Sequence, residues 1–110
     1  MHPVRAQGWY YLLGGLWPLV HLRSFAAVVG PKPDAFQTHV TSALFAATGA
    51  ALLRGTRDGA PDAATRVLAA GAAAGVGLVS LRYRRSIRPV LLADAALEAV
   101  FAAAALGTPD

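Results

Sequence analysis

Hydrophobic residues fall into four long stretches, separated by three short breaks rich in polar residues, glycine and proline. A helix needs about 20 apolar residues, within a usable range of roughly 17–25, to cross the hydrocarbon core of a bilayer. Three of the stretches have this length, and the third reaches it if the helix takes in residues 62–66 and Arg66 extends toward the headgroups. The pattern therefore predicts spans at residues 9–30, 35–53, 63–81 and 89–106.

The breaks contain residues that end helices. Pro31 and Pro33 follow Gly30, a polar Gly/Pro segment leads up to Pro61, and Pro89 suits the first position of the last helix. These connections are too short to hold a second domain. The sequence predicts a single domain over residues 1–110 with an all-α fold, a four-helix transmembrane bundle in a multi-pass integral membrane protein.

The composition agrees with a membrane protein. Of the 110 residues, 55% are hydrophobic and 15% are charged, whereas about a quarter of the residues in a soluble domain are charged. Alanine fills 25 positions and is only weakly apolar, so a soluble, alanine-rich helical bundle stays open as an alternative.

The net charge of +4 comes from nine arginines and one lysine set against six acidic residues. The basic residues flank the apolar stretches, a distribution typical of membrane proteins, and no basic face with readout residues predicts a nucleic-acid partner. We expect membrane lipid as a partner and a multi-pass location in the cell membrane. The side of the first and third connections holds five basic residues and the other side four, which favours termini outside. The two sets are Lys32, Arg82, Arg84, Arg85 and Arg88, and Arg5, Arg54, Arg57 and Arg66.

Aromatic residues cluster near the start of the first stretch. Trp9, Tyr10 and Tyr11 are consecutive, and Tyr83 lies beside the arginine-rich third connection. Tryptophan and tyrosine are enriched where helices meet the membrane interface, so the cluster predicts an aromatic belt. The alternative is that these rings fill a core.

The last stretch carries two acidic residues, Asp94 and Glu98, which share one helix face because they are four positions apart. Ionisable groups inside a span are costly and are candidates for substrate or proton pathways. At a rise of about 1.5 Å per residue, His21 and Glu98 both lie roughly 13 Å deep. Arg23 lies at a depth of roughly 10 Å and Asp94 at roughly 8 Å. We therefore expect the pairs His21–Glu98 and Arg23–Asp94.

Trp17 lies on the same helical stripe as His21, and Pro18 predicts a kink just below that histidine. The predicted ligand- or proton-binding residues are thus Glu98, Asp94, His21, Arg23 and Trp17. The alternative is that the charged pairs only orient two helices, because buried ion pairs add little net stability but are costly to break.

Other chemistry has weaker support. His21, His39, Asp94 and Glu98 could offer nitrogen and oxygen ligands to zinc, iron or manganese, but they lack the close spacing of a specific metal motif. The chain has no cysteine, and the pattern leaves open whether a cofactor binds and which one. No serine stands in the context of a nucleophile elbow, so we assign no catalytic residue. An enzyme acting on lipid or quinone through His21, His39 and the arginines around Arg84 is a third, less favoured hypothesis.

Gly71 and Gly75 form a small-residue face in the third stretch that allows another helix to approach closely. This face predicts either packing within one chain or a homodimer seam. The functional hypothesis is a small membrane protein with a buried acid–base cluster, acting in proton-linked transport or small-ligand binding. The alternative is a non-catalytic membrane subunit or scaffold.

Overall fold

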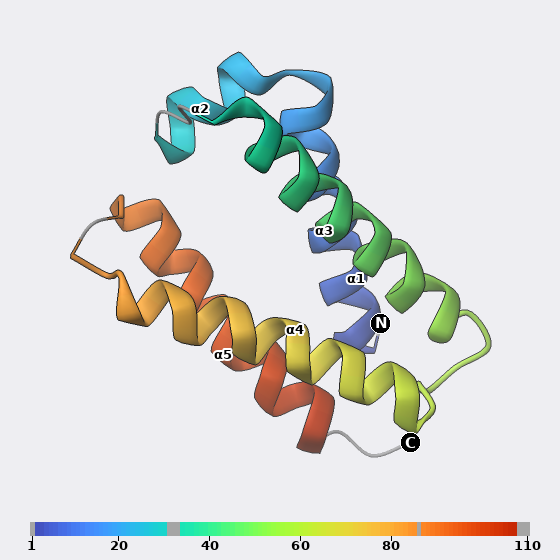
Figure 1. Ribbon diagram of the computed structural model, residues 1–110. Helices are drawn as coiled ribbons and strands as arrows, with labels where there is room; N and C mark the ends of the chain where they lie inside the picture. Colours follow the sequence, from blue (N-terminus) through green and yellow to red (C-terminus); the bar gives the residue numbers. More distant parts are fainter. Residues whose placement is uncertain (1, 31–33, 86, 108–110) are drawn as a thin grey trace.

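The computed structural model describes residues 2–30, 34–85 and 87–107. Their regular structure is helical, and the helices form two pairs (Figure 1). In one pair α1 packs against α3, and in the other α4 packs against α5, so that the pairs diverge like the arms of a V with α2 at the open end. The bounds are α1 Pro3–Val20, α2 Leu22–Val29, α3 Ala35–Gly55, α4 Ala63–Arg82 and α5 Pro89–Gly107.

Local capping sets where the helices begin. Asp34 and Asp62 each accept a hydrogen bond from a backbone N–H three residues ahead, at 3.0 and 2.8 Å. His2 caps α1 in the same way through Nδ1, which accepts from the N–H of Val4 at 3.1 Å. Pro3 then occupies the first turn. As a result α1 begins at Pro3, well ahead of the predicted start at residue 9.

The predicted first span is not one helix. The chain leaves helical geometry at His21, where φ is −148° and ψ is 83°, and α1 and α2 meet at a bend of 116°. Pro18 lies just before this point and has no backbone N–H to continue the helical ladder. Nδ1 of His21 accepts from the N–H of Ser24 at 3.2 Å and starts α2 in its new direction. The kink predicted from Pro18 is therefore a complete break.

Glycine lets α1 and α3 approach backbone to backbone. A Cβ atom at Gly15 would lie 2.5 Å from the backbone nitrogen of Ala46, and one at Gly49 would lie 2.4 Å from that of Leu12. Both distances are shorter than any side chain tolerates, so glycine is required at this crossing.

The outer surface is strongly apolar. Val20 is 81% exposed, Phe36 73%, Val67 69% and Leu106 73%. Water-soluble monomers rarely present contiguous apolar surface on this scale, whereas a protein surrounded by lipid does. Helices α4 and α5 are each long and apolar enough to cross a membrane, and α1 with α2 meets the same test as a bent pair. Helix α3 has 21 residues, but polar side chains in its first turns keep it out of this group.

Arginine side chains bind the carboxyl ends of helices. Each donates from Nη1 to a carbonyl oxygen in a last helical turn, where orphan carbonyls and the negative end of the helix dipole favour a cation. Arg5 binds Leu53 O of α3 at 3.1 Å, Arg66 binds Ala105 O of α5 at 2.9 Å, Arg84 binds Leu81 O of α4 at 2.9 Å, and Arg88 binds Ala27 O of α2 at 3.1 Å.

Candidate functional site: a groove between the two helix pairs

A groove of about 730 Å³ lies between the α1–α3 pair and the α4–α5 pair, and all five helices contribute to its wall. This volume is within the range of roughly 300–1,000 Å³ that is typical of small-molecule sites. Most of the lining is apolar, with aromatic rings from Tyr10, Tyr11, Trp17, Phe25 and Phe45. Hydroxyl and amide groups come mainly from the start of α3, at Gln37, Thr38, Thr41 and Ser42, with Ser80 from α4.

Two carboxylates line this groove, and each is held by a tyrosine of the opposite pair. The Tyr11 hydroxyl donates to Oε2 of Glu98, and the Tyr10 hydroxyl donates to Oδ1 of Asp94. Glu98 is only 1% exposed, whereas Asp94 is half-buried. Adjacent residues of α1 thus bind residues one turn apart on α5.

Aromatic packing fixes the two tyrosine rings. Tyr11 meets Phe45 of α3 edge to face, with centroids 5.2 Å apart, and Phe101 of α5 in the same way at 6.5 Å. Tyr10 also contacts Phe101, at 5.7 Å. Such ring contacts restrain the orientation of both tyrosines, with their hydroxyls directed toward the carboxylates.

Gln7 adds a third contact between the pairs. Its Nε2 donates to the carbonyl oxygen of Ala69 in α4 at 2.9 Å, while its buried Oε1 has no hydrogen-bond partner. Gln7 lies one helical turn before Tyr11 on α1. Gln7 therefore joins α1 to α4 one turn before the residue that binds Glu98.

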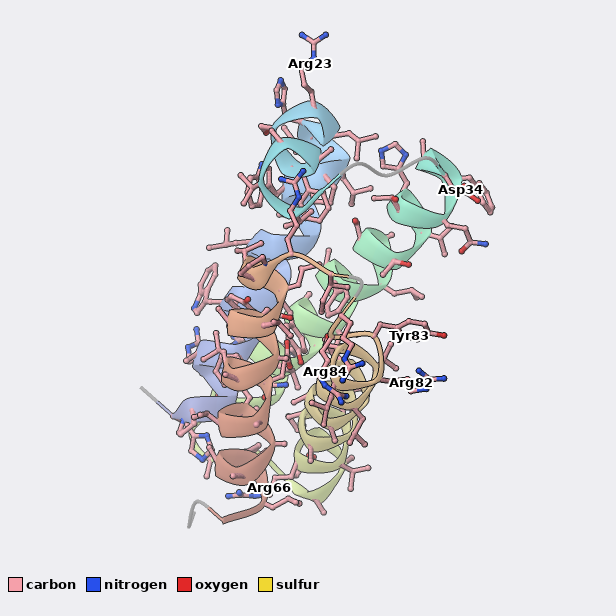
Figure 2. All side chains as sticks on the ribbon, turned by 90° about the vertical axis from the view of Figure 1, so that its left-hand side faces the viewer. Arg23, Asp34, Arg66, Arg82, Tyr83 and Arg84 are labelled. Carbon is pink, nitrogen blue, oxygen red and sulfur yellow. The ribbon has the colours of Figure 1, made fainter. Side chains whose placement is uncertain are left out.

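The predicted pairs His21–Glu98 and Arg23–Asp94 are wrong, because tyrosines occupy both carboxylates. His21 is exposed and its Nδ1 lies 2.7 Å from Oγ of Ser24. Figure 2 shows Arg23 at the tip of α2, directed away from the groove. The bend at His21 carries both residues off the α1 axis, and α1 presents its middle turns to α5 instead.

Trp17 does line the groove, as Asp94 and Glu98 do. Its Nε1 donates to Oγ of Ser24 at 2.8 Å, and its ring packs edge to face on Phe25 at 5.3 Å. Trp17 thereby closes the groove at the α1–α2 break.

The four candidate metal ligands do not come together. Among the residues that the structure describes, no three His, Asp or Glu side chains are grouped so that they could hold a metal ion. His21 and His39 both lie outside the groove wall, so Asp94 and Glu98 have no imidazole beside them there.

Tyr10, Tyr11 and Gln7 are the site residues that the sequence pattern did not reveal. Both tyrosines line the groove and Trp9 is 41% exposed, while the aromatic belt at a membrane interface stays a prediction. The four-residue spacing of Gln7 and Tyr11 would have marked one polar face of α1 if the helix had been started at Pro3.

No family model matches the chain, and neither the curated proteins nor the solved structures give a match. The groove itself is therefore the basis for assigning a function. In the described part of its wall the ionisable groups are two carboxylates and two phenols, without a lysine, arginine or histidine.

Proposed function

We propose that this chain is a small multi-pass membrane protein that binds a small ligand in the groove and exchanges protons at Glu98 and Asp94, as in proton-linked transport. The observation that carries the proposal is Glu98, a carboxyl group 1% exposed on an apolar, membrane-length helix, facing a groove large enough for a ligand. Ionisable groups in such segments are the usual carriers of protons and substrates.

Tyr10 and Tyr11 would couple proton or ligand binding at the carboxylates to the relative position of the two helix pairs. Tyr11 and Tyr10 donate to carboxylates of the opposite pair, so a proton or ligand that takes a carboxylate oxygen competes with these bonds. Binding of a proton or ligand to Glu98 would then shift the helix pairs between an arrangement with the tyrosine bonds and one without them. This shift requires that the two arrangements bind the ligand with different affinity.

Proton flux through proteoliposomes tests this role. With an imposed pH gradient and an internal pH-sensitive dye, the wild-type protein should collapse the gradient faster than protein-free vesicles. Glu98→Gln should reduce the rate to that of empty vesicles while the protein still inserts. Asp58→Asn, which changes an exposed acid in the α3–α4 connection, should behave as wild type. Equal rates for wild type and Glu98→Gln would refute the proton-linked role.

For the membrane arrangement we propose four crossings, with both termini outside and the α4–α5 connection in the cytoplasm. The dense basic cluster at Arg82, Arg84 and Arg85 supports this orientation. The cysteine-free chain allows single-cysteine labelling of whole cells with an impermeant maleimide. Ala60→Cys should react and Arg85→Cys should not, and the opposite pattern would reverse the orientation.

A second candidate function is a scaffold that associates through Gly71 and Gly75. The supporting observation is that a Cβ atom at either glycine would have no neighbour within 4 Å, so no described part of the chain packs closely on these two positions. Gly75→Leu should then convert a dimer to a monomer in native mass spectrometry, and Ala96→Leu, at an exposed alanine of α5, should not. A monomeric wild type would exclude a homodimer.

A further inference from the structure

We infer that the groove ligand is a small organic monocation with an apolar body, such as a protonated or quaternary amine, bound between Asp94, Glu98 and the aromatic rings. This inference rests on the proposed ligand-binding function and adds the chemical class of the ligand. It depends on three properties of the groove, namely its charge, its aromatic lining and its size.

Among the described residues, no basic side chain lines the groove beside its two carboxylates. Arg5, Arg66, Arg84 and Arg88 are engaged at helix carboxyl ends, and Arg23 is directed away. In the described part of the groove wall the groups that can carry full charge at neutral pH are both acids. The tyrosine hydroxyls give these carboxylates hydrogen bonds but no positive charge, and a buried carboxylate without a counter-charge is costly. The compensating charge therefore has to arrive as a proton or with the ligand. A cationic ligand and a proton would compete for the same oxygens.

The aromatic lining favours the same sign of charge. Tyr10, Tyr11, Trp17, Phe25 and Phe45 surround the site, and the faces of aromatic rings attract cations. An anion would instead lie beside two carboxylates and would gain no attraction from a ring face. The lining therefore selects against anionic ligands as well as for cationic ones.

Size and composition distinguish an organic cation from a metal ion. A volume of about 730 Å³ holds a molecule of several rings, and Val76, Val90 and Leu91 offer it apolar contacts. Divalent ions such as calcium instead take six to eight close oxygen ligands, and the described residues hold no such group. The hydroxyls of Thr41 and Ser42 could accept N–H bonds from a protonated amine.

Tryptophan fluorescence gives a direct binding assay, because the chain has two tryptophans and Trp17 is the one in the groove. In the Trp9→Phe background Trp17 is the sole reporter. Purified protein in detergent would be titrated with phenyltrimethylammonium, with benzenesulfonate as an anion of similar size and tert-butylbenzene as the neutral isostere. We expect a saturable fluorescence change for the cation, and affinities at least about tenfold weaker for the other two probes.

Variants locate the bound charge. Glu98→Gln and Asp94→Asn should each weaken binding of phenyltrimethylammonium by about tenfold or more, and Asp58→Asn should leave it unchanged. Asp94→Asn keeps the test decisive if Glu98→Gln does not fold. A variant counts as folded if its circular dichroism spectrum matches that of the wild type.

The inference is overturned if the anion or the neutral isostere binds as tightly as the cation, or if neither acid variant weakens cation binding. In that case the groove would still be a ligand site, and the proposed function would survive without this ligand class. Failure of all three probes to bind also overturns the inference. If Glu98→Gln in addition leaves proton flux unchanged, the proposed function falls with it.

Discussion

Two interfaces of this protein are built by opposite means. Between α1 and α3, Gly15 and Gly49 bring backbone against backbone, with no space for even a methyl group. Between the two helix pairs, the contact depends on long polar side chains, from Gln7, Tyr10 and Tyr11 to α4 and α5. The first interface is fixed by shape, whereas the second combines ring contacts on Phe101 with hydrogen bonds to Asp94 and Glu98 that a proton or ligand can replace.

This difference shows where movement could occur. A glycine crossing has one close-packed arrangement, so α1 and α3 would move together. Polar contacts around a groove can exchange partners at modest cost, since a typical hydrogen bond contributes about 0.5–1.5 kcal/mol net. The V between the pairs is therefore the expected place of conformational change.

The largest expected effect is at the glycine crossing. Gly49→Ala places a Cβ atom 2.4 Å from the backbone nitrogen of Leu12, and we expect it to lower the unfolding free energy by about 3 kcal/mol, at the upper end of usual overpacking costs. Gly71→Ala is the matched control because its Cβ atom meets nothing within 4 Å. Alanine should stabilise that helix by about 0.8–1.0 kcal/mol. Thermal denaturation in detergent measures both, and similar destabilisation by the two variants would remove the distinction between the interfaces.

The next effect concerns Tyr11. Tyr11→Phe keeps the ring packing but leaves the buried Glu98 carboxyl without its donor, which should cost about 1–3 kcal/mol. It should also broaden the distance between spin labels at Ala43→Cys and Ala93→Cys, two exposed positions on different helix pairs. Tyr83→Phe, at an exposed tyrosine, serves as the control. An unchanged distance distribution would mean that the hydroxyl does not join the pairs.

A smaller effect is expected at the open end of the V. Arg88→Met keeps the aliphatic stem but removes the 3.1 Å hydrogen bond to Ala27 O of α2, a loss of about 0.5–1.5 kcal/mol at most because the bond is exposed. Labels at Val28→Cys and Ala93→Cys should show α2 moving away from α5. Arg85→Met should leave the distance between the labels unchanged. If both variants displaced α2 equally, the cause would be the loss of a positive charge and not the loss of the Arg88 hydrogen bond.

The smallest expected effect is a pH-dependent change in stability from the Asp62 cap of α4, which is outside both interfaces. The backbone N–H and the hydroxyl of Thr65 lower the pKa of Asp62 below its ordinary value of 3.8. Since the folded pKa is depressed, the stability that this cap contributes is present above pH 3.8 and is lost as the pH falls through the folded value. Asp62→Asn should flatten this acid-side loss in a thermal melt, and an identical acid profile would exclude Asp62 as its source.

The sequence predicted the helical class, most helix ends and the acidic face of α5. Proline and glycine mark the breaks whatever the tertiary structure, and the four-residue spacing of Asp94 and Glu98 needs only a helix. The disruption at Pro18 was also predictable, because that proline removes a helical hydrogen bond. These features depend on local chemistry alone.

The partners of the acids were not predictable in the same way. Apolar character alone started the first helix near residue 9, whereas the His2 cap starts it at Pro3 and the bend at His21 ends it early. The residue that binds Glu98 is Tyr11 and not the predicted His21. The two positions are ten residues apart, which is about 15 Å along a helix. The arginines were read as signals of membrane orientation, and their bonds to helix ends depend on tertiary contacts that sequence spacing does not contain.

The depth of Glu98 in a bilayer is the point on which the whole account depends, and a spin label at Ala99→Cys measures it most directly. Ala99 is exposed and adjacent to Glu98 near the middle of α5. In reconstituted vesicles the label should collide readily with dissolved oxygen and hardly with a water-soluble nickel chelate, as expected inside hydrocarbon. Ready collision with the nickel chelate would put this part of α5 in water and contradict the proposed site.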